Sequence, residues 1–296
     1  MRWKDGFIAV DWGTTNRRAY RLDAGGRCLA SFEDNLGILS VEREEFPAAA
    51  AEIRERLGDL PMLLAGMVGS TRGWAEAPYV PCPASLGAQA GALRWVEEGM
   101  IAIVPGVSVI DSGRPDVMRG EEVQLFGAVA AGLIPKDCFV GHPGTHNKWV
   151  VLSDGQILTF RTVMTGELFG MLRETGMLAD ILVGDVSLGE AFNNGVSRGL
   201  AGAALTAELF SVRAGSLLGT LAREAAASFV SGLLIGADIA VGIGLATAEE
   251  PIIFMGDPQL TRFYLAAATL AGRDAQEVDG EAAFLAGAAA LAGMIQ

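Results

Sequence analysis

Short apolar runs separated by glycine turns mark the predicted strands of this chain. The run FIAV at residues 7–10 is followed by the small polar turn DWGTTN and then by the alternating pattern AYRL. The pair Gly25–Gly26 follows, ahead of a second alternating run, so the pattern predicts three strands joined by two tight turns. The stretch 61–70 predicts a buried strand that runs into a glycine loop, and further apolar runs predict strands within 101–111 and at 250–257.

Stretches with apolar positions three and four residues apart predict helices between these strands. One covers 44–58 and ends at Gly58, and another covers 120–132 and ends at Gly132. The remaining predicted helices are 91–98, 166–178, 186–196, 205–218, 221–244 and 280–294. Because strands and helices alternate along the chain, we expect an α/β fold.

The opening strand, turn and strand recur once in the second half of the chain. Residues 138–160 align with the opening stretch at a constant offset of 131 residues, without a gap through the turn. The aligned pairs are Gly13 with Gly144, Thr14 with Thr145, Asn16 with Asn147, Arg17 with Lys148 and Asp23 with Asp154. This repetition predicts a duplicated domain. Two hairpins that look alike by chance remain the alternative, because the match spans few identities.

Length and charge narrow the function classes. The 296 residues suffice for two domains. The formal net charge of −13 argues against a nucleic-acid partner, because such proteins neutralise phosphates with Lys and Arg. The three cysteines are widely spaced, which indicates neither a disulfide framework nor a zinc site.

We also expect a cytoplasmic protein without a membrane partner. The N-terminal residues MRWKDGF are charged and are not followed by the apolar region of a signal peptide. The longest apolar stretch, 229–246, carries Asp238 in its middle, so we expect a packed internal helix rather than a membrane span.

The first glycine turn carries candidate chemistry. Asp11 ends the first strand, and Gly13, Thr14 and Thr15 follow it. Glycine allows close backbone approach, Thr hydroxyls and exposed N–H groups suit phosphate oxygens, and carboxylates suit Mg²⁺. The turn therefore indicates a metal-phosphate site, with an ordinary Asx turn as the alternative. No Walker A, Rossmann or protein-kinase motif is present in the sequence.

Several longer motifs carry a resemblance to a known family. They are VDWGTTNRRAYRL, GMVGSTRGWAEAPYVPCPA, DVMRGEEVQLFGA, PGTHNKWV and TVMTGELFGML, with SGLLIGADI and FMGDPQL further on. The chain resembles the sugar kinase, Hsp70 and actin superfamily, and more closely the 2-dehydro-3-deoxygalactonokinase family. The resemblance implies two ribonuclease-H-like domains, 1–133 and 134–296, with an active-site cleft between them. It also implies transfer of phosphate from ATP to the terminal hydroxyl of 2-dehydro-3-deoxy-galactonate, a step in galactonate breakdown.

The resemblance also assigns ligand roles to residues. The expected metal ligand is Asp11, which the family places on Mg²⁺. The expected ATP-binding residues are Gly13, Thr14, Thr15, Asn16 and Arg17 in the first phosphate loop, Gly144, Thr145, His146, Asn147 and Lys148 in the second, and Gly256 and Asp257 in an adenosine loop. Many superfamily members open the second loop with Asp, where this chain has His142, so metal handling falls mainly to Asp11. For His142 and His146, structural and catalytic roles stay open.

The base and the substrate site are sought among polar residues on glycine-rich segments. By analogy with a GxEEA-like segment in related proteins, Glu121 is the first candidate for the base and Asp116 the second. Acids that complement the dipole of a helix N-terminus are the alternative. A sugar acid needs a cation for its carboxylate, and an Arg fits it best. The candidate substrate-binding residues are Arg72, Trp74, Tyr79, Arg119 and Thr165, with Arg161 as a further candidate cation.

Two other functions compete with a kinase. A phosphohydrolase of the exopolyphosphatase kind shares the GEE-like segment but needs no sugar pocket, so the loop GMVGSTRGWAEAPY favours the kinase. A non-catalytic sugar sensor on the same fold usually adds a helix-turn-helix. The substrate epimer and the oligomeric state, monomer or homodimer, stay open.

Overall fold

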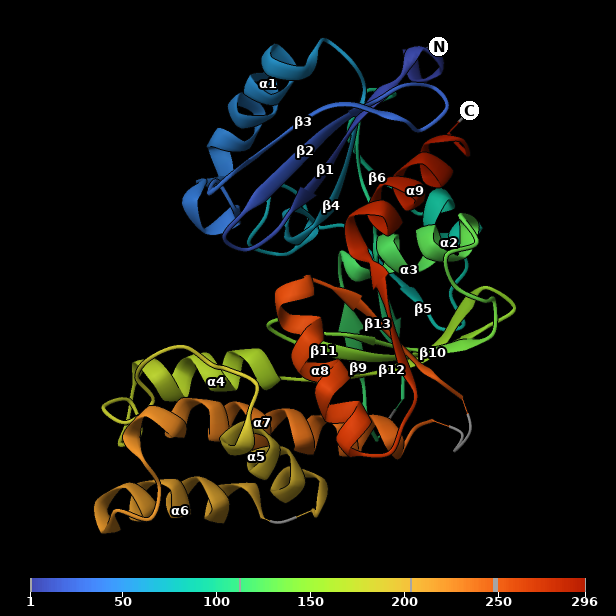
Figure 1. Cartoon of the computed structure of the whole chain (residues 1–296). Coiled ribbons are helices and arrows are strands. Elements are labelled where there is room, and N and C mark those ends of the chain that lie inside the picture. The colour runs from blue at the N-terminus through green and yellow to red at the C-terminus, as the bar shows by residue number, and fades with distance from the viewer. Residues whose placement is uncertain (1, 112, 203, 247–249, 296) are drawn as a thin grey trace. The chain divides into compact units, whose positions relative to one another are not determined.

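The computed structural model describes residues 2–111, 113–202, 204–246 and 250–295 (Figure 1). The chain packs into two compact units, each described below by itself. The first unit contains Met1–Asp137, Leu152–Phe160 and Gly280–Gln296, and the second contains Cys138–Val151 and Arg161–Asp279. This division rests on packing and not on the repeat, so the domain boundary at 133/134 stays a prediction.

A six-stranded mixed sheet forms the centre of the first unit, in the order β3-β2-β1-β4-β7-β6. β2 pairs antiparallel with both β1 and β3, whereas β1, β4 and β7 run parallel. The strands are β1 (Phe7–Trp12), β2 (Arg17–Leu22), β3 (Cys28–Asp34), β4 (Met62–Gly66), β6 (Arg94–Glu97) and β7 (Ile101–Ile103). The three strands predicted around the opening turn are confirmed.

Helices cover both faces of this sheet (Figure 1). On one face, Val10 and Trp12 pack with Phe46 and Ile53 of α1 (Phe46–Leu57). The other face packs against α2 (Leu86–Gly91), α3 (Glu121–Ala130) and α9 (Gly280–Ala292). A small sheet of β5 (Tyr79–Pro81), β8 (Gly106–Val109) and β9 (Asp116–Met118) completes the unit. The predicted helices at 44–58, 120–132 and 280–294 are confirmed.

The helix predicted at 91–98 is wrong. α2 ends at Gly91, and residues 94–97 form the edge strand β6, antiparallel to β7. Trp95 and Val96 are aromatic and β-branched residues that pack well on a pleated surface. Trp95 meets Trp3 edge-on, with ring centroids 6.2 Å apart. Packing at the sheet edge therefore overrides the apparent helical spacing.

The second unit repeats the strand order of the first. Its residues form most of a five-stranded sheet in the order β12-β11-β10-β13-β14, which matches β3-β2-β1-β4-β7 position by position. The strands are β10 (Cys138–His142), β11 (Asn147–Ser153), β12 (Gln156–Val163), β13 (Ile252–Gly256) and β14 (Ala275–Asp279). The predicted duplication is therefore confirmed, and with it the α/β class. β14 has no counterpart in the sequence prediction.

Helices of the second unit pack on this sheet and on each other. They are α4 (Thr165–Glu174), α5 (Glu190–Leu200), α6 (Leu205–Leu218), α7 (Arg223–Ile243) and α8 (Pro258–Leu270). The sequence pattern missed α8, which follows a glycine loop directly. Among helices of the described residues, α7 is long and apolar enough to cross a membrane by length and composition, yet 72% of its most apolar window is buried in the protein. That burial is typical of the internal helix predicted there.

Asp238 of α7 is the polar centre of the second unit. It is 1% exposed and accepts four side-chain hydrogen bonds. Asn147 Nδ2 and Trp149 Nε1 donate to Oδ1 at 2.9 and 2.7 Å, and Thr165 Oγ1 and Tyr264 Oη donate to Oδ2 at 2.5 and 2.7 Å. Burial raises the pKa of Asp238. One carboxyl thus joins β11, α4 and α8 to α7.

We expect Asp238→Ala to lower the free energy of unfolding by roughly 3 kcal/mol or more, because it leaves four buried donors without an acceptor. Asp238→Asn should cost only about 1 kcal/mol, since its amide oxygen can replace Oδ1 and its NH₂ can donate to the two hydroxyls. Denaturant unfolding measures both. The exposed Asp185→Ala is the control, and equal stability of the Asp238→Ala and Asp185→Ala variants would contradict the assignment.

Candidate active site

The first glycine turn lies at the carboxyl end of β1. Residues Gly13–Asn16 connect β1 to β2, and Gly13 N–H donates to the carbonyl of Asn16 at 2.9 Å. Thr14, Thr15 and Asn16 are exposed. β4 runs parallel to β1, so its carboxyl end and the following segment Met67–Gly69 lie at the same sheet edge. Ligands of open α/β sheets bind at this edge.

Two neighbouring rows of side chains cross β1, β2 and β3 on opposite faces of the sheet. Trp12, Arg17 and Asp34 form one row, and Asp11, Arg18 and Glu33 form the next. Because successive strand residues point to opposite faces, the two rows have different surroundings. The Trp12 row faces α1, whereas the Asp11 row lies on the face of α3 and α9.

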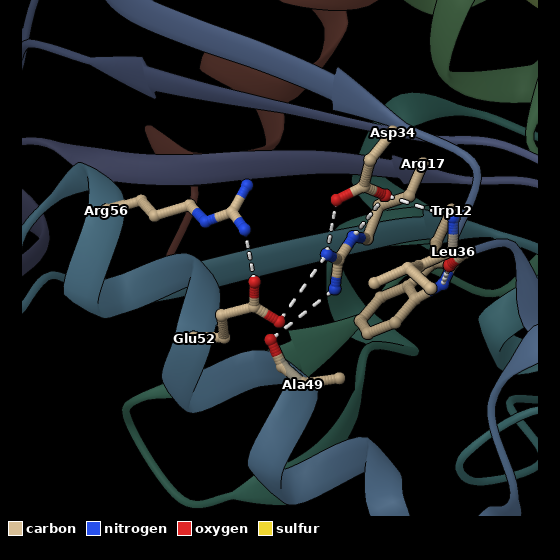
Figure 2. A network of polar contacts seen from close by, with 7 residues as sticks. All are labelled: Trp12, Arg17, Asp34, Leu36, Ala49, Glu52 and Arg56. Atoms are coloured by element: carbon tan, nitrogen blue, oxygen red, sulfur yellow. Dashed lines mark hydrogen bonds and ion pairs between the residues drawn. The ribbon is translucent and has the colours of Figure 1, made fainter.

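Arg17 is built into the core of the first unit (Figure 2). Its guanidinium is fully buried and donates from Nη2 and Nε to Asp34 at 2.6 and 3.1 Å. It also lies over the Trp12 ring, 5.1 Å from the centroid, and 4.0 Å from Glu52. The expectation that Arg17 neutralises phosphate charge is therefore not carried forward, because its donors serve this network.

Arg18 is the cation that the sequence interpretation missed. It is partnered with Asp11 in the β1–β2 register, and its charge lowers the pKa of Asp11. Its side chain is 45% exposed and pairs with Glu33 at 3.3 Å. Counting outward from the four-residue turn pairs residue 12 with 17 and 11 with 18, so strand alternation could have found Arg18.

Asp11 and Glu121 belong to one electrostatic group. The pKa of Asp11 is raised to about 6, mainly by burial; the charge of Arg18 lowers it, and the charges of Glu121 and Glu33 raise it. Glu121 begins α3, and its Oε2 accepts a hydrogen bond from Arg119 N–H at 3.1 Å. The two leading candidate catalytic acids are thus brought together.

Two glycines allow this approach. Gly66 ends β4 and Gly120 precedes α3, and both have positive φ, of 88° and 106°. A Cβ on Gly120 would lie 3.2 Å from Gly66 Cα, and a Cβ on Gly66 would lie 3.4 Å from Asp11 Oδ1. The N-terminus of α3 therefore packs directly on the strand end beside Asp11.

Glu122 has a different environment from Glu121. It is fully buried, and both carboxyl oxygens lie within hydrogen-bond distance of Gly120 N–H, at 2.7 and 2.9 Å. Its pKa is raised to about 8, mainly by burial and then by the charge of Glu121, against the lowering effect of its backbone hydrogen bonds and of Arg119. The Glu122 carboxyl thus holds the turn before α3.

Asp116 lies on a different structural element from the residues around Asp11. It belongs to β9 of the small sheet, and its Oδ1 accepts from the Val117 amide at 2.9 Å. The charges that act on the pKa of Asp11 are Arg18, Glu121 and Glu33. The geometry therefore favours Glu121 over Asp116 for chemistry beside Asp11.

The predicted substrate-binding residues of the first unit, Arg72, Trp74, Tyr79 and Arg119, have different surroundings. Arg119 stacks over the Tyr79 ring at 4.4 Å and donates from Nη2 to Ala77 O at 2.8 Å, while its Nε and Nη1 are buried and have no hydrogen-bond partner. Trp74 is partly buried and stacks on the core residue Phe46, with ring centroids 6.3 Å apart. Arg72 is exposed on the loop after β4. Among these four residues, Arg119 has buried N–H donors without a hydrogen-bond acceptor.

The second glycine turn connects β10 to β11. Thr145 is exposed, and His146 Nε2 contacts Glu167 Oε2 of α4 at 2.6 Å. Lys148 is 6% exposed, and its Nζ donates to His146 O at 3.0 Å, so its side chain helps to hold the turn. His142, at the end of β10, is 8% exposed.

Asn147 and Thr165 are held by Asp238. Both are buried and donate to its carboxyl oxygens. The expectations that Asn147 binds nucleotide and Thr165 binds sugar acid are therefore not carried forward, because their side chains serve this buried network. Asn147 Oδ1 has no hydrogen-bond partner.

The predicted adenosine loop adjoins the second turn. A Cβ on Gly256 would lie 3.1 Å from Pro143 O, and Asp257 caps α8 by accepting from Gln259 N–H at 2.7 Å. A cavity of about 50 Å³ lies nearby, lined by residues that include Gly144, Gly166 and Leu260. It is far smaller than ordinary ligand pockets, so the adenosine assignment stays a prediction.

The comparison with protein families decides what the chain is related to. The model of the 2-keto-3-deoxy-galactonokinase family matches residues 11–291. The chain belongs to this family. A relative from Escherichia coli (strain K12), named 2-dehydro-3-deoxygalactonokinase, is 40% identical over 97% of each chain. A relative from Rhizobium meliloti (strain 1021), named as a probable enzyme of the same kind, is 36% identical over 97% of this chain and 96% of its own.

Two solved structures share the fold of this chain. A Sinorhizobium meliloti protein, described as a putative 2-dehydro-3-deoxygalactonokinase, has a TM-score of 0.90 at 35% identity, covering 97% of this chain and 98% of its own. Component A of (R)-2-hydroxyglutaryl-CoA dehydratase from Acidaminococcus fermentans has a TM-score of 0.52 at 14% identity, covering 97% and 96%. The α/β fold of this chain is therefore shared beyond its own family.

The carboxylates beside the first turn of this protein suit a magnesium ion that keeps most of its bound water. In the described residues no three His, Cys, Asp or Glu side chains are grouped to hold a metal. Mg²⁺ commonly binds through one or two carboxylates together with water and substrate phosphates. Asp11, with Glu121 near it, fits that requirement.

We expect Asp11→Asn to stabilise the fold above pH 6. The pKa of Asp11 is about 6 in the folded protein against an ordinary value of 3.8, so ionisation costs stability as the pH rises between these values. At pH 8 the variant should gain about 1–3 kcal/mol, and this gain should vanish near pH 4. Urea unfolding across this pH range measures it, with Asp185→Asn as control. A loss of stability at pH 8 would contradict the stated cause.

Proposed function

We propose that the protein is an ATP-dependent kinase that phosphorylates the 6-hydroxyl of 2-dehydro-3-deoxy-D-galactonate in the cytoplasm. Beyond the family, the observation that supports this is the carboxylate pair Asp11 and Glu121 beside a glycine turn with exposed Thr14 and Thr15. Phosphoryl transfer needs positioning, charge neutralisation and a proton acceptor, and these residues supply such groups.

Asp11 is the proposed anchor for hydrated Mg²⁺. When bound, Mg²⁺ neutralises phosphate charge and orients the transferred group. Arg18 lies in the same row as Asp11 and takes the charge-neutralising role first expected of Arg17. Gly13, Thr14, Thr15 and Asn16 offer backbone amides and side-chain groups to phosphate oxygens.

Glu121 is the proposed acceptor of the proton from the attacking hydroxyl. It lies close enough to Asp11 for their charges to interact, and the Arg119 N–H bond steadies its carboxylate. Such a base contributes typically about 10²–10⁴ in rate. The buried Glu122 holds the turn before α3 through its contacts with the Gly120 N–H.

The second unit is the proposed source of the remaining nucleotide contacts. Gly144, Thr145 and His146 belong to a turn equivalent to the first, in which Thr145 is exposed, and Gly256 and Asp257 adjoin it. Lys148 donates a hydrogen bond to the carbonyl of His146 in that turn and adds a positive charge next to it. Closure around the substrates would exclude water and limit ATP hydrolysis.

Arg119 is the proposed anchor for the carboxylate of the sugar acid. Its Nε and Nη1 are buried without a partner, which is costly unless a ligand supplies an acceptor. Tyr79 holds the guanidinium plane by stacking. A planar Arg fork matches carboxylate oxygens, which Lys cannot reproduce.

ATP consumption against a panel of 2-dehydro-3-deoxy sugar acids tests the proposed function. We expect turnover with the galacto acid, phosphate at its 6-position, and loss of turnover by Asp11→Asn with the fold intact. Turnover with none of the acids, combined with hydrolysis of polyphosphate, would overturn the kinase in favour of a phosphohydrolase. Full activity of Asp11→Asn would remove Asp11 from the site.

Arg119→Lys should raise the KM for the sugar acid at least about tenfold and leave the KM for ATP nearly unchanged, because it removes a carboxylate contact. Steady-state kinetics with each substrate varied measures the split. The exposed Arg114→Lys is the control. If Arg72→Lys shows the rise and Arg119→Lys does not, Arg72 is the anchor.

A further inference from the structure

Three carbonyl groups of the first turn, those of Gly13, Thr14 and Thr15, are held by one segment of the chain. The amides of Gly37, Ile38 and Leu39 donate to Thr15 O, Gly13 O and Thr14 O at 3.0, 3.0 and 3.1 Å. In a trans peptide the C=O of one residue and the N–H of the next point in opposite directions. Three bonded carbonyls therefore turn the N–H groups of Thr14, Thr15 and Asn16 away from this segment, on residues that are exposed.

Position 37 has no room for a side chain, which explains its glycine. Its φ of −66° is accessible to any residue, so backbone conformation does not require glycine. A Cβ on Gly37, however, would lie 2.3 Å from Thr15 C and 2.4 Å from Thr14 O. These are backbone atoms, so a side chain there would push the turn itself.

The second turn is held in a similar way by the start of α4. A Cβ on Gly166 would lie 2.6 Å from Gly144 O and 2.9 Å from Thr145 Cα. The next amide, of Glu167, donates to Thr145 O at 2.9 Å, and the Glu167 carboxylate contacts His146 at 2.6 Å. This arrangement turns the His146 N–H away from α4.

We infer that Gly37–Leu39 and Gly166–Glu167 are positioning segments that set the phosphate-binding shape of the two turns. The inference rests on the proposed function for the identity of the anion. The two segments differ in structure: Gly37 precedes the 3₁₀ turn Ile38–Ser40, and Gly166 lies in the first turn of an α-helix. The same contact between a glycine and a turn backbone thus occurs in two unrelated local structures.

The consequence is that a single methyl group at either glycine should misplace the amides that face phosphate. Displacements of about 1 Å near reacting groups can cost roughly 10²-fold in rate. Neither glycine offers a side chain to a ligand, so any effect must pass through the turn. The remainder of each unit should keep its packing.

The sharpest test compares Gly166→Ala with Gly170→Ala, because both lie in α4 and a Cβ on Gly170 meets nothing within 4 Å. Equilibrium titration with Mg·ADP should show dissociation constants raised at least about tenfold for Gly166→Ala and unchanged for Gly170→Ala. Equal affinities in the two variants and the parent would overturn the inference for the second turn.

The first turn is tested by Gly37→Ala against Gly87→Ala, whose Cβ would lie 4.0 Å from its nearest neighbour. We expect kcat to fall at least about tenfold for Gly37→Ala with the KM of the sugar acid changed little, because the turn faces phosphate. Unchanged kcat in both variants would overturn the inference for this turn.

Glu167→Ala provides a variant on the helix surface in case Gly166→Ala does not fold. Its side chain is 40% exposed, so the change should leave the fold intact while removing the His146 contact. Affinity for Mg·ADP should weaken about threefold or more relative to Glu174→Ala on the same helix, and equal affinity would contradict the inference. A parent protein that binds Mg·ADP but transfers no phosphate to sugar acids would refute the proposed function and still allow these binding comparisons.

Discussion

The ion pair between Arg17 and Asp34, fixed on one face of the β1–β2–β3 meander, is the constraint on which the first unit depends. Arg17 and Asp34 lie in the same row of side chains as Trp12, on the face of the sheet that packs against α1, and Arg17 lies over the Trp12 ring. Because strand residues alternate, the same register places Asp11 and Arg18 on the other face. A buried charge pair therefore fixes which of two adjacent arginines is available to a ligand. The residue that stabilises the sheet, Arg17, and the residue proposed to contact phosphate, Arg18, are neighbours in the sequence on opposite faces of the sheet.

Close glycine contacts then bring segments from distant parts of the sequence to this edge. Gly66 and Gly120 let the start of α3 approach Asp11, and Gly37 and Gly166 let later segments press on the two turns. At each of these contacts a Cβ would meet backbone, so the geometry is set by the absence of side chains. Burial of Asp11 and Glu122 raises both pKa values, to about 6 and about 8, which shows that the site is kept at a cost in stability.

Much of the fold could be predicted from the sequence, because apolar runs and glycine turns are local signals. The repeat at 138–160 predicted two equivalent sheets, which the matching strand orders confirm. The helix predicted at 91–98 failed because packing at a sheet edge, and not spacing, decides the structure around Trp95. In the site, Asp11 and Glu121 followed from motifs, whereas Arg18, the Asp238 network and the contact between Gly37 and Thr15 depend on pairing across the chain that no single motif contains.

The central claim is that Glu121, held beside Asp11, accepts the proton during phosphoryl transfer, and Asp116 does not. The most direct measurement is kcat of Glu121→Gln and of Asp116→Asn at saturating ATP and sugar acid. We predict that kcat falls by about 10²–10⁴ for Glu121→Gln and changes only within a few-fold for Asp116→Asn. A large loss for Asp116→Asn together with normal turnover by Glu121→Gln would contradict it.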